Sequence, residues 1–337
     1  MMDDDPAIDD VPPRSPVVRI AAATALAAAF ALGVYLLLNA LRPSSGIIAF
    51  SFLLVLPAGI SAFVAYVSDP WGRAGFNRYL MVPVYIVLAV CIMSLVVLRE
   101  GVICVLLLAP LWLIAGLAGS GLTYVIRRRL RRGRHYCAAL FVAPLLAMQV
   151  EPMLPLPATE AVVTRSAIIA APAEAIWPLL EGIPDVKPGE GAWNLSQDVI
   201  GIPRPLGARL VGAGIGADRL ANWGRRVRFR ERITAWEPGR RIGWRFIFDD
   251  IEGWKFTDRH LMPDSAYLRV TRGGYTLAPI DAGHTRVTLD THYWMKTPVN
   301  GYAALWGELF LGDLEDNLLA LVKQRAESGP SVRRPVG

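Results

Sequence analysis

The sequence predicts two structurally different halves: a membrane α-helical bundle, followed by an α+β domain in which an antiparallel sheet packs against a long C-terminal helix. Hydrophobic residues make up 53% of the 337 residues, but they are concentrated in long apolar runs between positions 17 and 150. From position 151 on, short runs of strand-like character alternate with turn sequences, and one amphipathic helical pattern closes the chain. This uneven distribution is typical of a membrane region fused to a globular domain.

Five apolar segments account for the membrane half. Four of them reach the roughly 20 residues that cross about 30 Å of hydrocarbon, and the fifth is shorter; they are residues 17–41, 46–67, 79–98, 101–126 and 135–150. The short connections between the first four predict antiparallel neighbours in a compact bundle. Each segment after the first is interrupted by one proline, at which membrane helices kink; these are Pro57, Pro83, Pro110 and Pro144. We interpret this half as an anchor, because no charged residue or histidine lies in the middle of the first four segments.

The arginines predict the orientation of the bundle. Residues 1–150 carry 12 arginines, no lysine and 7 acidic residues, and most of the arginines flank the first segment, lie between the second and third, or follow the fourth within residues 127–134. Positive charge marks cytoplasmic loops, so these three clusters and the N-terminus are expected in the cytoplasm. Residues 151–337 carry 23 basic and 22 acidic side chains. The basic charge of the chain therefore belongs to the membrane region, and we expect no nucleic-acid partner.

The fifth segment decides on which side the second half works. As a helix, its 16 residues would measure roughly 24 Å, which is short for a crossing unless the bilayer thins locally. An interfacial or re-entrant segment is the alternative, but the segment is apolar on all sides and has no polar face. We therefore expect a crossing, which would place the second half outside the cytoplasm.

The second half begins after a proline-rich linker at 151–158. Strand patterns are expected at 160–170, 208–212, 218–223, 227–236, 242–248, 267–277 and 285–295. A short helix starts near Pro172, and a long one runs to about Glu327, with Thr297 and Pro298 as its expected N-cap and first residue. An antiparallel sheet with a helix across it has one face to bury. The acidic N-terminus, 1–16, and the tail, 329–337, are expected to be disordered.

The sequences "SAIIAAPAEAIWPLL", "RFRERITAWEPGRRIGW" and "NGYAALWGELFLGDLEDNLLALVKQRAE", in this order, resemble the START-like (SRPBCC) superfamily, which includes polyketide cyclases/dehydrases and lipid-transfer domains. The resemblance covers residues 159–328 and leaves the membrane region, 17–150, uncovered. It implies a helix-grip fold, in which a curved sheet surrounds the last helix around an apolar cavity.

Strand alternation indicates which side chains face that interior. In "RRVRFRERI" the apolar residues and Glu231 share one face, while the arginines at 226, 228, 230 and 232 form a solvated outer face. The candidate ligand-binding residues are Trp177, Phe229, Glu231, Trp244, Phe246, Tyr293, Trp306 and Phe310. The alternative is that these side chains fill a solid core.

Glu231 is the single candidate for catalysis, as a general base with a raised pKa. The alternative is a structural ion pair with Arg219 or Arg245. The spacing of His260, His284, Asp290 and His292 gives neither a metal site nor a triad, so no metal or cofactor is expected.

These observations favour a membrane-anchored protein that binds a hydrophobic molecule, such as a lipid, and that is not a catalyst. Two alternatives stay open: a polyketide cyclase/dehydratase-like enzyme with an acid/base pair in the cavity, and a structural module that binds a protein partner. The sequence names neither the ligand nor a protein partner.

Overall fold

The computed structural model describes residues 16–41, 48–69, 72–98, 102–129, 136–250, 252–255 and 262–328. The chain divides into a helical unit, residues 1–97 and 108–153, and a sheet unit, residues 98–107 and 154–337. The expected acidic N-terminus as far as residue 15, the loop at Arg99 and Glu100, His260 and the C-terminal tail lie outside the described residues.

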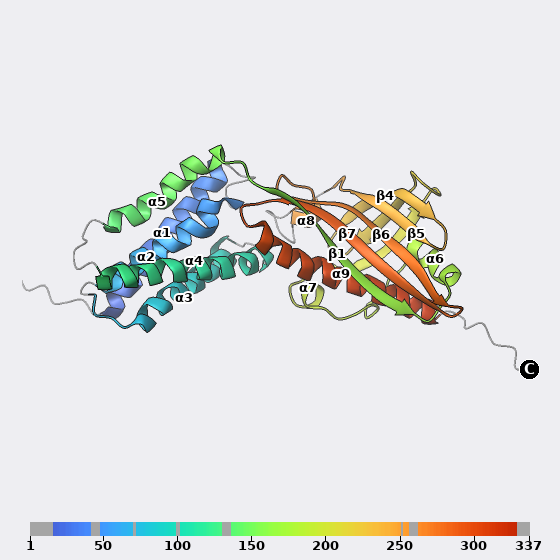
Figure 1. Cartoon of the computed structure of the whole chain (residues 1–337), viewed down its shortest axis with the longest axis horizontal. Helices are drawn as coiled ribbons and strands as arrows, with labels where there is room; N and C mark the ends of the chain where they lie inside the picture. Colours follow the sequence, from blue (N-terminus) through green and yellow to red (C-terminus); the bar gives the residue numbers. More distant parts are fainter. Residues whose placement is uncertain are drawn as a thin grey trace, which may run out of the picture. The chain divides into compact units, whose positions relative to one another are not determined.

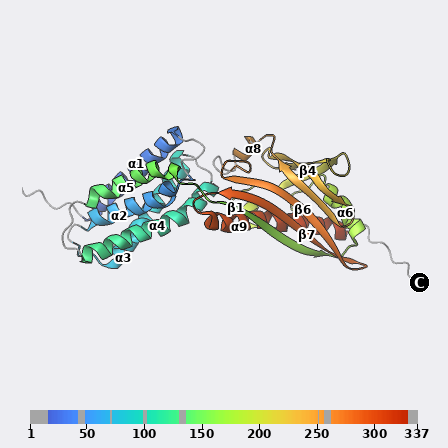
Figure 2. The ribbon, with the colours of Figure 1, turned by 45° about the horizontal axis from the view of Figure 1, so that its top comes forward.

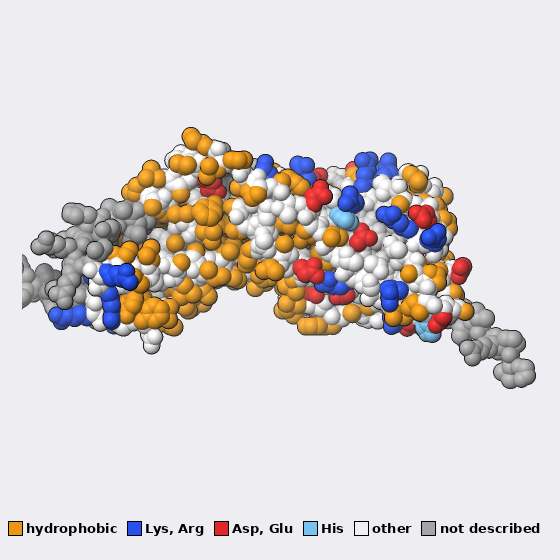
Figure 3. Space-filling model, viewed as in Figure 1, with side chains coloured by type: hydrophobic (Ala, Val, Ile, Leu, Met, Phe, Trp, Pro, Cys, Tyr) orange, Lys and Arg blue, Asp and Glu red, His pale blue; other side chains and the backbone are white. Residues whose placement is uncertain are grey.

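The helical unit follows the predicted segments closely (Figure 1). Its helices are α1 (Pro16–Leu41), α2 (Leu56–Ser68), α3 (Phe76–Met93), α4 (Val102–Arg129) and α5 (Tyr136–Val150), with π-helical turns η2 (Ser51–Val55) before α2 and η3 (Ser94–Leu98) after α3. Within the described residues, four helices are long and apolar enough to cross a membrane: α1, α2 with its preceding turn η2, α3 with its following turn η3, and α4. The 15 residues of α5 fall short of that length. Figure 3 shows hydrophobic side chains over much of this unit's surface.

The prolines do not end the helices, in line with the expectation that membrane helices tolerate them. Pro83, Pro110 and Pro144 lie inside helices that continue on both sides, and Pro57 lies in the first turn of α2. Because the π-turn Ser51–Val55 runs directly into α2, Pro57 also lies within a continuous helical segment. The π-turn Ser51–Val55 directly before Pro57 is the local irregularity at this position.

Close helix packing explains Gly119 on α4. A Cβ atom at this position would lie 2.1 Å from the carbonyl oxygen of Ala58 on α2, so only glycine allows this approach. Small residues at such crossings are the usual means by which membrane helices come into contact.

The two ends of α2 have different neighbours within the helical unit. At its C-terminal end, the Arg127 guanidinium of α4 donates to the Tyr66 carbonyl oxygen at 3.2 Å. At the other end, Glu151, which directly follows α5, accepts hydrogen bonds from the Ser51 amide at 2.9 Å and from the Ser51 hydroxyl at 2.5 Å. A carboxylate at a helix N-terminus satisfies free N–H groups and complements the helix dipole. Helix α5 therefore ends beside the start of η2, whereas α4 ends beside the C-terminus of α2.

The sheet unit is an antiparallel sheet with the strand order β1-β7-β6-β5-β4-β3-β2. The strands are β1 (Ala158–Ile169), β2 (Pro205–Val211), β3 (Asp218–Trp223), β4 (Arg228–Glu237), β5 (Arg241–Ile247), β6 (Leu268–Asp281) and β7 (His284–Lys296). The helices are α6 (Ala173–Glu181), α7 (Leu195–Asp198), α8 (Glu252–Lys255) and α9 (Asn300–Ser328), and a 3-10 turn, η4 (Glu151–Met153), precedes the unit. Every strand lies within a few residues of its predicted position, but α7 and α8 were not predicted.

The long helix starts later than the sequence predicted. Thr297 and Pro298 are not its N-cap and first residue, because α9 begins at Asn300. The Asn300 side-chain oxygen accepts from the Thr297 amide and the Thr297 hydroxyl, each at 2.8 Å. These bonds hold residues 297–299 in a turn ahead of the helix.

Helix α9 lies along one face of the curved sheet, and its main contacts are with β1, β7, α6 and α7 (Figures 1 and 2). The predicted alternation on β4 is confirmed: the side chains of Val227, Phe229, Glu231 and Ile233 are buried. The arginines between them lie on the outer face, where Arg230 and Arg232 pair with Asp218. The inner face of the sheet and α9 therefore enclose the interior of this unit.

Candidate ligand-binding site

A buried ion pair lies on the inner face of the sheet. Arg219 of β3 stands directly opposite Glu231 of β4, and its guanidinium donates to the Glu231 carboxylate. The two side chains are only 7% and 6% exposed. Burial raises the pKa of Glu231 and the guanidinium opposes that shift, whereas the pKa of Arg219 is raised by the nearby carboxylate, so the arginine stays charged. Of the two sequence-based readings of Glu231, the structure shows the ion pair, and the partner is Arg219.

Two aromatic residues lie beside this pair. The Arg219 guanidinium lies 5.7 Å from the ring of Trp244 on β5, and this ring lies 5.4 Å from that of Tyr275 on β6. Burial is the main cause that raises the pKa of Tyr275 to about 12, so its phenol stays neutral and can donate a hydrogen bond. The Trp244 indole N–H and the Arg219 Nε–H find no acceptor among the described residues.

Glu315 of α9 adds a second buried carboxyl group, which the sequence analysis missed. It is 2% exposed, and neither carboxyl oxygen has a hydrogen-bond partner within the part of the chain that the structure describes. Burial raises its pKa to about 8, and the Thr291 hydroxyl on β7, which lies near the carboxyl group but outside hydrogen-bond geometry, only partly opposes this shift. Glu315 is therefore mostly protonated at neutral pH and can donate a hydrogen bond as a carboxylic acid. The sequence signal was available, since Glu315 falls within the apolar stripe of α9.

The inner face of the sheet has no side chain between Trp244 and Thr291, because a glycine lies between them. Across the sheet, Trp244 stands opposite Gly273, which stands opposite Thr291. A Cβ atom at Gly273 would lie 3.2 Å from Cε2 and Cζ2 of the Trp244 indole and 2.9 Å from the Asp290 carbonyl oxygen. Gly273 therefore lets the indole pack directly against the backbone of β6.

Aromatic rings form the apolar surroundings of the pair on the strand side. The ring centroid of Phe229 lies 5.8 Å from the ring centroids of both Phe246 and Phe248, and 6.2 Å from that of Trp254 on α8. Phe246 also lies 6.1 Å from Trp244, so it connects the aromatic group to the polar one. Phe246 and Phe248 are only half-buried, although they share the inner face with Trp244. Such a surface suits an apolar molecule.

The structure brings only part of the predicted set together. Glu231, Trp244, Phe229 and Phe246 form the group described above. Trp177 packs edge-on against Trp236 at 5.4 Å, and its indole N–H donates to Glu181 at 2.5 Å. It belongs to the same packed apolar core as Trp244 and Tyr275.

The remaining three predicted residues lie elsewhere. Tyr293 belongs to a separate apolar cluster with Val163 and Met295. Trp306 and Phe310, half-buried on α9, contact each other at 5.4 Å. On β7, His292 Nε2 and Asp290 Oδ2 lie 3.1 Å apart at half-buried positions outside this group.

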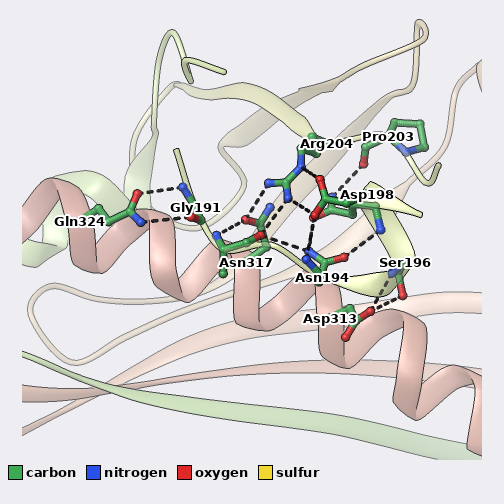
Figure 4. A network of polar contacts seen from close by, with 11 residues as sticks. Gly191, Asn194, Ser196, Asp198, Pro203, Arg204, Asp313, Asn317 and Gln324 are labelled. Atoms are coloured by element: carbon green, nitrogen blue, oxygen red, sulfur yellow. Dashed lines mark hydrogen bonds and ion pairs between the residues drawn. The ribbon is translucent and has the colours of Figure 1, made fainter. Parts of the chain in front are cut away.

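A polar network fixes the segment around α7 to helix α9 (Figure 4). Asp313 accepts from the amide and the hydroxyl of Ser196, at 2.9 Å and 2.5 Å. The Asn317 side-chain oxygen accepts from the Ala192 amide at 2.9 Å and from Arg204 at 3.2 Å. Asn317 is 2% exposed, so these bonds satisfy a buried amide and hold one wall of the interior in place.

A curved antiparallel sheet with a long C-terminal helix along its inner face places the sheet unit in the helix-grip class of folds. Residues 160–327 match the family described as polyketide cyclase / dehydrase and lipid transport. This agrees with the START-like resemblance of the sequence; the helical unit lies outside the match.

Solved structures with a similar fold include the Zhui aromatase/cyclase from Streptomyces sp. R1128, with 16% identity over 50% of this chain and 94% of that chain at a TM-score of 0.31. Norcoclaurine synthase from Thalictrum flavum, in complex with dopamine and hydroxybenzaldehyde, is 13% identical. The match covers 51% of this chain and 89% of that chain, with a TM-score of 0.33. A START superfamily protein from Mycobacterium smegmatis is 13% identical. The match covers 49% of this chain and 97% of that chain, with a TM-score of 0.32. At these identities and scores, the likeness carries no conclusion about activity. No curated protein sequence matches the chain significantly.

Proposed function

We propose that this chain is a membrane-anchored protein whose sheet unit binds a hydrophobic molecule, such as a lipid, between the sheet and α9, without changing it chemically. One observation carries the proposal: the buried indole N–H of Trp244 and Nε–H of Arg219 lack partners among the described residues, and the ring of Phe246 lies beside Trp244. The buried carboxyl group of Glu315 on α9 also lacks a partner there. Buried polar groups in native proteins are nearly always satisfied, so a group of unpartnered ones indicates a bound partner. The matched family, which includes lipid transport, agrees with this reading.

Mass spectrometry of molecules that co-purify with the full-length chain tests the proposal. The chain is purified in a mild detergent, and its small-molecule content is compared with that of the bulk membrane extract. We expect one class of apolar molecule to be enriched over the extract. A content that mirrors the bulk lipids, with no enriched species, contradicts the proposal.

An enzymatic role in the manner of the cyclases is the second candidate, and Glu315 favours it. A carboxyl group with a pKa of about 8 can give or take a proton near neutral pH. The purified protein with its co-purified molecule, incubated for hours and followed by mass spectrometry, separates the two roles. An unchanged mass and retention time support binding alone; conversion that Glu315→Gln or Glu231→Gln abolishes supports catalysis.

We further propose that the N-terminus lies in the cytoplasm and the sheet unit outside it, with α5 as the fifth crossing. Two contacts support this topology. Glu151 accepts from Ser51, so the end of α5 lies beside the N-terminal end of α2 with its preceding turn. Arg127 donates to Tyr66, so the end of α4 lies beside the C-terminal end of α2. The arginines that follow α4 mark the cytoplasmic end. Helix α5 starts after them and ends at the opposite end of the helical unit.

Reporter fusions after residues 133 and 158 test this topology. We expect a fusion at 133 to report the cytoplasm and a fusion at 158 to report the opposite side. Both reporters on one side would show that α5 does not cross, whatever the sheet unit binds.

A further inference from the structure

We propose that the α7 segment, residues 191–204, docks on the surface of the bilayer through the exposed side chains of Trp193, Leu195 and Val199. This contact would hold the sheet unit against the membrane, in addition to the covalent link to the helical unit. It rests on the membrane anchoring in the proposed function and is independent of any ligand in the interior.

The α7 segment exposes apolar side chains and buries polar ones. Trp193, Leu195 and Val199 are 73%, 41% and 63% exposed. The polar residues between them are buried: Asn194, Ser196 and Gln197. Figure 3 shows hydrophobic side chains gathered over this part of the sheet unit. A chain that folds in water usually has the opposite arrangement, and clustered exposed apolar side chains mark a surface that another apolar surface covers.

The buried polar side chains fix the segment, so the apolar ones keep their exposed positions. Asp313 of α9 accepts from the amide and the hydroxyl of Ser196 (Figure 4). The Gln197 side chain donates to the Pro203 carbonyl oxygen at 3.0 Å. The Asn194 side chain caps α7 by accepting from the Gln197 amide at 2.8 Å. A segment that is already ordered loses little conformational entropy when it docks.

The segment carries no unpaired charge that would oppose contact with a bilayer. Its only charged side chains, Asp198 and Arg204, pair with each other at 2.6 Å. The Asp198 carboxylate also accepts from the Asn194 amide at 2.8 Å. A paired charge costs less to bring close to hydrocarbon than a free one. Trp193 suits the membrane–water interface, because its ring is apolar and its N–H can stay hydrated.

Helix α9 extends this apolar surface. Trp306 and Phe310 precede Asp313 and Asn317 by seven residues, so they lie on the face of α9 that binds the α7 segment. Both aromatic residues are half-buried, and their rings lie 5.4 Å apart. The exposed side chains of the α7 segment therefore continue into an aromatic stripe on the same side of α9.

The bilayer is an apolar surface that this segment can always reach. Seven residues, 151–157, join α5 of the helical unit to β1 of the sheet unit. Even when fully extended, they span at most about 30 Å. A protein partner would have to be recruited, whereas the helices of the chain bring the bilayer with them. We therefore assign the bilayer, and not a second protein, to this surface.

The fluorescence of Trp193 tests the docking directly. The full-length chain is reconstituted in nanodiscs of plain or brominated phosphatidylcholine, and the Trp193 emission is taken as the difference between wild type and Trp193→Phe. We expect the brominated lipid to quench this emission and dissolved iodide to leave it unchanged. The control is Trp294, half-buried on the outer face of the sheet, whose emission, obtained with Trp294→Phe, should be quenched by iodide and not by the lipid.

A double variant assigns the contact to the neighbouring side chains. Leu195→Ser/Val199→Ser should lower the ratio of docked to undocked segment at least about tenfold, because two large apolar side chains no longer leave water. The Trp193 emission should then become accessible to iodide. Val211→Ser/Ile215→Ser, at positions outside the segment that are 49% and 71% exposed, should leave that emission as in wild type.

The outcomes separate the docking from the proposed function. Quenching of Trp193 by iodide and not by the brominated lipid overturns the docking, but leaves membrane anchoring and ligand binding intact. Protection from both quenchers shows that a second copy of the chain covers the segment, which also overturns it. A chain that stays in solution without detergent and does not enter nanodiscs shows that both the anchoring and the docking are wrong.

Discussion

Replacing Arg219 by methionine would leave the carboxylate of Glu231 buried without its counter-charge. Both side chains are less than a tenth exposed, so water cannot take the place of the guanidinium. Removal of one partner of such a pair typically costs about 3–5 kcal/mol. Since the sheet unit is the size of a typical 150–250-residue domain, that loss corresponds to a fall in Tm of roughly 6–20 °C. Glu231→Leu, which strands the guanidinium, should cost a similar amount.

The double variant Arg219→Met/Glu231→Leu should recover most of this loss. Two apolar side chains of similar volume remove both buried charges, and such replacements are often neutral or stabilising. The assay is thermal unfolding of the full-length chain in nanodiscs, followed by tryptophan fluorescence.

An exposed ion pair provides the matched control. The side chains of Arg165 and Glu308 are 29% and 54% exposed, and their nitrogen and oxygen atoms lie 2.7 Å apart. Loss of either partner should cost less than about 1 kcal/mol. The reasoning is refuted if Arg219→Met is as mild as Arg165→Met, or if the double variant loses the sum of the two single losses.

Three further predictions concern the interior and its wall. The pKa of Glu315 rises from 4.5 to about 8 on folding, so the folded chain holds a proton that the unfolded chain loses. The contribution of Glu315 to the free energy of unfolding should therefore be greatest below pH 4.5, fall by at most about 1.4 kcal/mol per pH unit up to about pH 8, and then level off. The difference in the free energy of unfolding between wild type and Glu315→Gln, measured by denaturant titration at each pH, should follow this fall; a difference that does not change with pH would contradict it. Gly273→Ala places a Cβ 3.2 Å from the Trp244 ring, so it should lower the free energy of unfolding by about 1–3 kcal/mol and shift the tryptophan emission. In the control Gly283→Ala, the new Cβ would lie 3.8 Å from its nearest neighbour, and the change should be near neutral. Equal effects of the two substitutions would contradict the close packing. Asn317→Ala removes the acceptor of the Ala192 amide and should lower the free energy of unfolding by about 1–3 kcal/mol. Hydrogen exchange in residues 190–204 should become faster. Unchanged exchange there would show that the network of Figure 4 does not hold this segment.

Local patterns in the sequence were sufficient for the strands and for the two faces of β4. The side chains of a strand alternate with period two, so Phe229 and Glu231 had to share a face opposite the arginines. The start of α9 was predicted wrongly because Thr297 and Pro298 match the usual cap pattern, whereas the Asn300 side chain holds a turn there instead. The short helices α7 and α8 have too few residues to show a period.

The partner of Glu231 depended on register, which a single strand does not reveal. Arg219 and Arg245 were both candidates. The pairing of β3 with β4 puts Arg219 opposite Glu231 on the same face, while Arg245 alternates with Trp244 and stands opposite Arg232 on the outer face. One strand pairing therefore decided between the two candidates.

The sequence by itself determined the long apolar helices, the arginine clusters that flank them, and the antiparallel strands with their closing helix, because each of these follows from periodicity or charge within one segment. Only the tertiary structure decided that Glu315 of α9 is a buried, unpartnered carboxyl group on the side of Thr291 and Tyr275, and that Glu151 lies beside Ser51. These residues are far apart in the sequence. Their meeting depends on how whole strands and helices pack, which no local pattern encodes.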